Sequence, residues 1–253
     1  MYRDLVLEYK DDPENKGDIF SITDELFLNK YANHITFNSE FSKTTAIAKY
    51  HLKSKSLSVV YNGVELPLII EEQTKSSDTI RIGFVGRLVE VKRVDRLIEA
   101  IAAISDKSKI SIELIGDGPQ KESIIHLISK NNLTDTIELL GFKNNLSSYY
   151  SQWDLLIAPS TNEAFGLVAI EAYSYGCAVA VYSDGGGLAE LVNKCEPNMV
   201  FENTKELTIF IDSIVEHSID INETKLRNHR KAFAQKFSIE KMDLAINQVY
   251  LSL

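Results

Sequence analysis

The pattern that decides the fold lies in residues 79–118, TIRIGFVGRLVEVKRVDRLIEAIAAISDKSKISIELIGDG. Residues 79–85 are rich in Ile, Val and Phe, which is typical of a buried strand. Residues 94–104 place apolar side chains at helical spacing, and residues 109–115 form a second apolar run that ends at Gly116. A strand, a helix and a strand in this order indicate a βαβ unit with parallel strands.

The same alternation continues to residue 201. We expect further strands at 136–140, 154–158, 177–182 and 199–201. The helices expected between them lie at 122–129, 146–152, 165–175 and 188–193, followed by helices at 204–217, 223–235 and 238–251. Before residue 64 the pattern is weaker, with a helix at 42–51 and a strand at 57–60. The expected fold is therefore α/β, a Rossmann-like parallel sheet of about six strands flanked by helices.

The composition of the chain disfavours several classes of function. The chain has 253 residues, of which 44% are apolar and 25% charged, as in ordinary globular proteins. Its net charge of −9 repels a phosphate backbone, so we do not expect nucleic acid as a partner. Its two cysteines, Cys177 and Cys195, have no metal-ligand spacing, so no structural metal site is expected. Because we find no signal peptide and no apolar run of membrane-spanning length, a cytoplasmic location is expected, with peripheral membrane contact left open.

Glycine or turn residues follow five successive strands, where ligands bind in open α/β sheets: Gly86, Gly116, Gly141, Pro159 and the run 184–187. Gly86 leads at once into Arg87, whose planar guanidinium suits a diphosphate. Lys92 supplies a second, more mobile positive charge. The alternative interpretation is a solvated charge cluster in front of a helix.

The segment 159–172, PSTNEAFGLVAIEA, is the richest in polar and glycine signals. Its helix is expected to begin near Phe165 or Gly166, with free backbone N–H groups that favour an anion. Gly166 would let a ligand approach the backbone closely. Glu163 and Glu171 are eight residues apart, ~12 Å at helical rise, so one carboxylate could accept hydroxyls of a sugar and the other those of a ribose. The alternative is one acid at a helix N-terminus and one ordinary surface glutamate.

Taken together in order and spacing, these motifs resemble the donor-binding half of retaining GT-B glycosyltransferases of family 4. The resemblance rests on Gly86-Arg87…Lys92, Ile115–Pro119, Leu140-Gly141-Phe142, Glu163-x-Phe165-Gly166-Leu167…Glu171 and Gly185-Gly186-Gly187…Glu190. Residues 39–43 and 60–64 resemble the end of that family's N-terminal domain and its interdomain linker. Ala164 stands where glycine is common in the family, and residues 193–198 lack a glycine often found there.

The resemblance implies a role for each matched residue. Arg87 and Lys92 correspond to the diphosphate-binding pair, and together with Glu163, at the donor sugar, they make up the implied catalytic group. The implied substrate-binding residues are Glu171 at the ribose, Gly141 and Phe142 at the base, the Phe165-Gly166-Leu167 loop at the sugar and phosphate, and Gly86 and Gly116 beside them. The implied division is 1–64 as the remnant of an acceptor domain with linker, 65–237 as the nucleotide-sugar domain and 238–253 as a crossover helix.

The implied reaction is sugar transfer from a nucleotide-diphosphate sugar with retention, in polysaccharide or glycoconjugate synthesis. Positive side chains and the helix N-terminus would stabilise the leaving diphosphate. The sequence has no Asp-x-Asp motif, so neither a metal nor another cofactor is expected.

Because the acceptor half has no counterpart in the sequence, the isolated chain is expected to be an incomplete transferase. It would then self-associate or need a partner chain that carries the N-terminal domain. A non-catalytic nucleotide-sugar-binding subunit is therefore the main alternative, with a GT-B epimerase or hydrolase as a weaker one. A dinucleotide-dependent oxidoreductase is disfavoured, since no strand end carries G-x-G-x-x-G.

Overall fold

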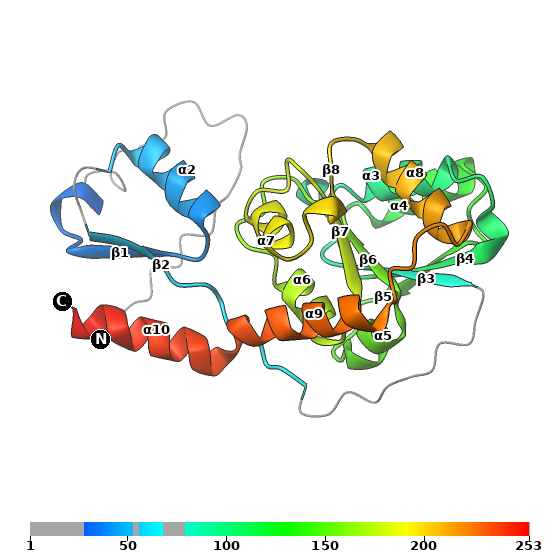
Figure 1. Ribbon diagram of the computed structural model, residues 1–253. Coiled ribbons are helices and arrows are strands. Elements are labelled where there is room, and N and C mark those ends of the chain that lie inside the picture. The colour runs from blue at the N-terminus through cyan, green and yellow to red at the C-terminus, as the bar shows by residue number, and fades with distance from the viewer. Residues whose placement is uncertain (1–27, 53–55, 68–78, 253) are drawn as a thin grey trace.

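The computed structural model describes residues 28–52, 56–67 and 79–252. Within these ranges six parallel strands form one sheet, in the order β5-β4-β3-β6-β7-β8 (Figure 1). They are β3 (Ile80–Val85), β4 (Ile110–Ile115), β5 (Ile137–Gly141), β6 (Leu155–Ala158), β7 (Ala178–Tyr182) and β8 (Val200–Phe201). The predicted α/β fold with a parallel sheet of about six strands is confirmed.

Helices connect and cover these strands. The α-helices are α3 (Val94–Ala102), α4 (Lys121–Lys130), α5 (Ser147–Gln152), α6 (Leu167–Ser174), α7 (Gly187–Cys195), α8 (Thr204–Val215), α9 (Thr224–Ala234) and α10 (Ile239–Leu251). The 3₁₀ turns are η1 (Glu90–Lys92), η2 (Lys107–Lys109), η3 (Pro197–Met199) and η4 (Gln235–Phe237). Helix α3 packs with α4 and α8, whereas α6 packs with α5, α7 and α9.

The strand order reverses direction between β3 and β6. The chain moves outward from β3 through β4 to β5, then returns to pair β6 with β3 and continues outward through β7 to β8. Because parallel crossovers are right-handed, the two directions place their helices on opposite faces of the sheet. The β3–β6 junction is thus the topological switch point, at which open α/β sheets bind their ligands.

The centre of the sheet is buried on both faces, and this explains the apolar runs in the sequence. Every residue of β6 and β7 is buried. Gly83 in β3 lies directly under the ring of Trp153, where a Cβ atom would come within 2.2 Å of it. The core therefore needs glycine at this point of the strand.

The earlier part of the chain forms a separate small sheet. Strands β1 (His34–Phe37) and β2 (Ser56–Val59) pair in parallel, and α2 (Glu40–Tyr50) connects them. This sheet and α10 both lie in the left half of Figure 1. The linker contacts the start of α10, since the Val64 amide donates to the Phe237 carbonyl at 2.9 Å.

Helix α10 buries none of its residues against the described chain. Its exposed apolar side chains include Ile239, Leu244 and Leu251. The amphipathic pattern of residues 238–251 therefore predicts the helix correctly. Its other apolar positions, among them Met242, Ala245 and Val249, are half-buried by the residues that the structure describes.

Candidate functional site

The loops that follow β3, β6 and β7 are joined by backbone hydrogen bonds at one edge of the sheet. The Thr161 amide donates to the Val91 carbonyl at 2.9 Å, and the Asn162 amide donates to the Asp184 carbonyl at 2.9 Å. Gly187 donates to the carbonyl of Glu163 at 2.7 Å. These bonds hold the segments of Arg87, Glu163 and the glycine run together, as expected for strand ends of a parallel sheet.

Lys92 and Glu163 form an ion pair inside this cluster of loops. The ammonium Nζ lies 2.7 Å from Oε1 of Glu163, and the two side chains are 19% and 21% exposed. The stem of Lys92 passes the Cα of Gly86, where a Cβ would lie 3.5 Å from it. The pair joins residues 71 positions apart, and it places one carboxylate at the switch point.

The second oxygen of Glu163 lacks a partner. Oε2 is buried and accepts no hydrogen bond from the described chain. Leaving a buried acceptor unpaired costs about 1–3 kcal/mol. A ligand hydroxyl at this oxygen would therefore gain a charge-assisted hydrogen bond that the protein does not supply.

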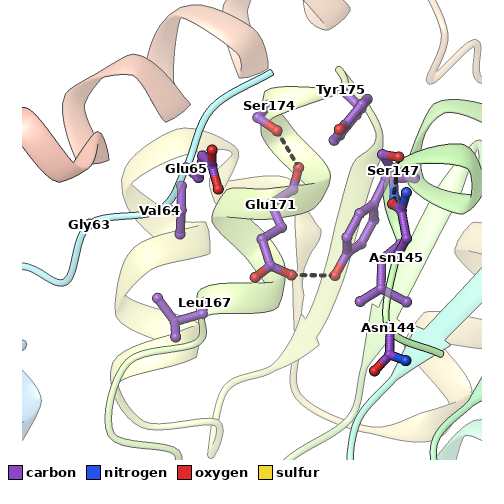
Figure 2. Close-up of a pocket in the computed structure, with 12 residues that line it drawn as sticks. Gly63, Val64, Glu65, Asn144, Asn145, Ser147, Leu167, Glu171, Ser174 and Tyr175 are labelled. Carbon is purple, nitrogen blue, oxygen red and sulfur yellow. Dashed lines mark hydrogen bonds between the residues drawn. The ribbon is translucent and has the colours of Figure 1, made fainter. Parts of the chain in front are cut away.

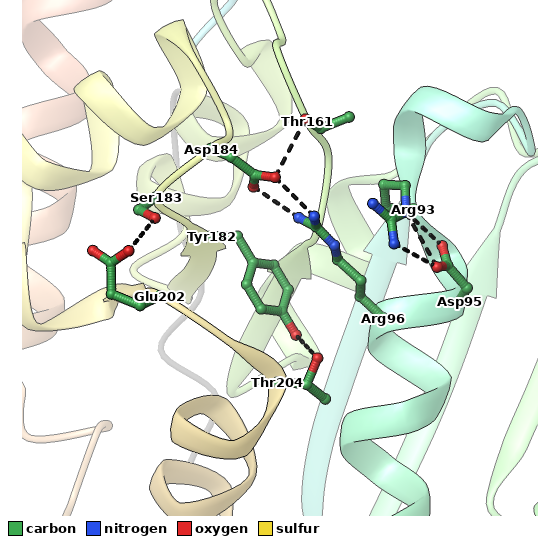
Figure 3. Close-up of polar contacts among 9 residues, drawn as sticks. All are labelled: Arg93, Asp95, Arg96, Thr161, Tyr182, Ser183, Asp184, Glu202 and Thr204. Carbon is green, nitrogen blue, oxygen red and sulfur yellow. Dashed lines mark hydrogen bonds and ion pairs between the residues drawn. The ribbon is translucent and has the colours of Figure 1, made fainter.

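Arg87 differs from the other arginines near this edge. Its side chain is exposed, and within the described ranges it makes no hydrogen bond or ion pair. Arg93 is held by Asp95 at 2.8 Å, and Arg96 is held by both carboxylate oxygens of Asp184 at 2.7 and 2.8 Å (Figure 3). The hydrogen bond from Arg96 lowers the pKa of Asp184. Of these three guanidinium groups, that of Arg87 is the one available to a ligand.

Two of the predicted ligand-binding glycines have structural reasons to be glycine. Gly166 caps α6 with φ +100°, and a Cβ there would lie 2.5 Å from Cδ1 of Leu188. Gly116 has φ +148°, and its Cβ would lie 1.8 Å from the Gly86 carbonyl oxygen. Packing between neighbouring loops therefore requires both glycines, whatever they do for a ligand.

Glu171, on α6, lines a pocket. The pocket has a volume of about 440 Å³ (Figure 2). Its lining residues are Gly63, Val64, Glu65, Asn144, Asn145, Leu146, Ser147, Tyr150, Leu167, Glu171, Ser174 and Tyr175. Glu163 does not line it. The two acids of the sequence motif therefore serve neighbouring but different parts of the site.

A buried tyrosine orients the carboxylate of Glu171. The hydroxyl of Tyr150, on α5, donates to Oε2 of Glu171 at 2.7 Å. Burial, reinforced by the charge of Glu171, holds the pKa of Tyr150 well above its usual value. The phenol therefore stays protonated and acts as a donor.

The two residues that the sequence resemblance assigns to the base shortly precede the pocket-lining residues 144–147 in the chain. Gly141 ends β5 with φ +67°, and no atom lies within 4 Å of the position its Cβ would take. Phe142 follows with 71% of its surface exposed. Phe165, by contrast, is buried and stacks on Tyr61 at 6.0 Å, so its ring serves the core.

The sequence of the chain that builds this site matches a known protein family. The profile of the family described as "Glycosyl transferases group 1" matches residues 67–237, about two thirds of the chain.

The chain belongs to this family.

Relatives of this group 1 glycosyltransferase chain include an uncharacterized glycosyltransferase of Methanocaldococcus jannaschii. That protein is 33% identical over 247 residues, which cover 88% of this chain and 62% of the relative. A Campylobacter jejuni enzyme, N-acetylgalactosamine-N,N'-diacetylbacillosaminyl-diphospho-undecaprenol 4-alpha-N-acetylgalactosaminyltransferase, is 28% identical, with coverages of 71% and 49%. The chain thus spans about half to two thirds of the length of these relatives.

The fold has close counterparts among solved structures. Anabaena HepE, solved in complex with UDP and glucose, superposes on this chain with a TM-score of 0.80 at 22% identity. The superposition covers 96% of this chain and 69% of the HepE chain. This likeness shows the GT-B fold. No helix in the ranges that the structure describes is long and apolar enough to cross a membrane.

The contacts of three polar residues escaped the sequence analysis, which names Ser39 and Glu190 only within motifs and does not single out Tyr150. Ser39 caps α2, and its hydroxyl donates to the Ala164 carbonyl at 2.7 Å. Glu190 accepts from the Phe41 amide at 2.8 Å, although the sequence placed Glu190 only within a motif. The segment before the linker therefore docks on the loop that carries Glu163. No local pattern indicates the contacts of Ser39 and Glu190, because each joins residues more than 120 positions apart.

Proposed function

We propose that this chain binds a nucleotide-diphosphate sugar at the β3–β6 switch point and provides the donor site of a retaining glycosyltransferase of family 4. The observation that carries the proposal is the exposed guanidinium of Arg87, which makes no hydrogen bond or ion pair within the described ranges. It follows Gly86, past whose Cα the stem of Lys92 runs to its ion pair with Glu163. Membership of the group 1 family and the UDP complex of the structural relative support it.

The parts of the donor divide among the parts of the site. Arg87 and Lys92 bind the diphosphate and stabilise the charge that develops on it as the sugar leaves. The free N–H groups at the start of α6 add to this stabilisation. Oε2 of Glu163, which has no partner in the described chain, accepts a hydroxyl of the sugar.

The nucleoside occupies the pocket beside Glu171. About 440 Å³ falls within the roughly 300–1,000 Å³ typical of small-molecule sites. In this proposal Glu171 accepts a ribose hydroxyl, and Gly141 and Phe142, which precede the pocket-lining residues 144–147 in the chain, contact the base. We assign to this chain the donor site alone. The transfer of the sugar to a polysaccharide or glycoconjugate acceptor is proposed for the whole protein.

Calorimetry with UDP, GDP, ADP and their glucose and N-acetylglucosamine conjugates tests the proposal. We expect one nucleotide to bind and its sugar conjugate to bind more tightly. Binding without transfer to any acceptor would assign the chain the role of a nucleotide-sugar-binding subunit. The absence of binding by all these compounds to the folded chain would refute the proposal.

The two acids should act on different parts of the donor. Glu171→Gln should weaken binding of the free nucleoside diphosphate and of its sugar conjugate alike, by about 10- to 100-fold, since a hydrogen bond to a charged group contributes roughly 1.5–3 kcal/mol. Glu163→Gln should remove the additional affinity that the sugar provides. The affinity for the free nucleotide should stay the same as in the unmodified chain, because Glu163→Gln also releases the ammonium of Lys92 from its ion pair, so that it can bind the diphosphate.

Calorimetry on the two variants and on Glu122→Gln measures this division of roles. Glu122 is an exposed acid on α4, and its side chain makes no hydrogen bond or ion pair within the described ranges, so its substitution controls for the loss of one negative charge. Equal losses of free-nucleotide affinity in Glu163→Gln and Glu171→Gln would contradict the assignment.

A further inference from the structure

The carboxylate of Glu171 is held by a rigid partner. Tyr150 is 2% exposed and lies between two rings, with Trp153 at 5.5 Å edge-on and Tyr175 stacked at 6.0 Å. Its hydroxyl therefore has little freedom to move away from Oε2 of Glu171, 2.7 Å distant. The interaction joins α5 to α6 across the wall of the pocket (Figure 2).

The other carboxylate oxygen is left for a ligand. Among the residues that the structure describes, none donates a hydrogen bond to Oε1 of Glu171, and Glu171 lines the pocket. A glutamate has three side-chain torsions, and immobilising them on binding opposes affinity. Since Tyr150 already restrains the carboxylate, Glu171 has largely lost this torsional freedom before a ligand binds.

We propose that Tyr150 is a positioning residue that makes the pocket selective for ribonucleotides over deoxyribonucleotides, by holding Glu171 ready to accept a ribose hydroxyl. The inference rests on the proposed function. It assigns Tyr150 no contact with the nucleotide. Its effect must therefore pass through Glu171 and must concern the ribose hydroxyls alone.

The test compares Tyr150→Phe with the unmodified chain. The probes are UDP, GDP and ADP, each with its 2′-deoxy and 3′-deoxy counterparts, and calorimetry measures the ratio of ribo to deoxy affinity. For the unmodified chain we expect a ratio of about ten, the value of one hydrogen bond to a charged group. In Tyr150→Phe the ratio should fall by about 2- to 10-fold, the effect of releasing one flexible side chain.

Two matched variants separate positioning from packing. Tyr149→Phe removes a hydroxyl from the adjacent residue. Within the described ranges this hydroxyl makes no hydrogen bond, and Tyr149 lies outside the pocket lining. This substitution should leave the ratio unchanged. In a Glu171→Ala background the ratio should already be near one, and adding Tyr150→Phe should not change it further.

Each outcome decides between the possibilities. A lower melting temperature with an unchanged ribo-to-deoxy ratio in Tyr150→Phe would show that the hydrogen bond is purely structural and would overturn the inference. The proposed function would still stand in that case, because the variant would still bind the nucleotide. A ratio that falls in the Glu171→Ala background as well would show that Tyr150 does not act through Glu171. Failure of the unmodified chain to bind UDP, GDP or ADP would overturn the proposed function, and this inference with it.

Discussion

Arg87→Ala is expected to weaken binding of the nucleoside diphosphate by about 10- to 100-fold, since each hydrogen bond to a charged group contributes roughly 1.5–3 kcal/mol. The melting temperature should stay unchanged, because the Arg87 side chain is exposed and makes no contact that stabilises the described chain. Calorimetry and thermal unfolding measure the two quantities on the same samples.

Two further variants show whether geometry or net charge is responsible. Arg87→Lys keeps the charge but loses the planar fork, so its affinity should lie between those of the unmodified chain and Arg87→Ala. Lys130→Ala removes one exposed positive charge from the far end of α4 and should change affinity little. A folded Arg87→Ala chain with full nucleotide affinity would exclude Arg87 from phosphate binding.

Glu196→Gln is expected to lower the free energy of unfolding by about 3–5 kcal/mol, the usual effect of breaking a buried ion pair from one side. Arg230 is 1% exposed, and two of its nitrogens each donate to Glu196 at 2.8 Å. Its third nitrogen donates to the carbonyl of Ile221 at 2.6 Å. An amide at residue 196 would turn N–H donors toward the guanidinium and leave its charge unpaired.

Denaturant titration measures this free energy. Glu40→Gln is the control, because Glu40 pairs with Lys43 at 3.4 Å with 54% of its side chain exposed. Exposed pairs contribute about 0–1 kcal/mol, so that variant should unfold almost as the unmodified chain does. A loss below about 1 kcal/mol in Glu196→Gln would show that the buried guanidinium does not need its carboxylate.

The elements and the fold class followed from local patterns. Residues 79–85 predicted β3 within one residue, because a strand buried on both faces must be apolar throughout. The helix predicted over 165–175 begins at Leu167, two residues later than the pattern indicated, because Phe165 belongs to the core before the helix. The helix predicted over 42–51 begins earlier, at Glu40, because Ser39 caps it.

The sequence also predicted which strand-end residues come together in the candidate site. Parallel strands carry their carboxyl ends to one edge, so Gly86, Glu163 and the glycine run had to lie near one another. Their partners were not predictable. The sequence singles out Arg87 by its position directly after Gly86. It does not indicate that Arg87 makes no ion pair within the described ranges, whereas Arg96 is held by Asp184.

By itself, then, the sequence determined the order of strands and helices, the parallel sheet and the edge at which a ligand would bind, because hydrophobic periodicity is a property of neighbouring residues. Only the tertiary structure decided that Lys92 pairs with Glu163, that Tyr150 restrains Glu171, and that the two acids face different spaces. The first contact joins residues 71 positions apart, and the second joins residues 21 positions apart on separate helices. Such contacts depend on how loops and helices pack over the sheet, which no periodicity along the chain encodes.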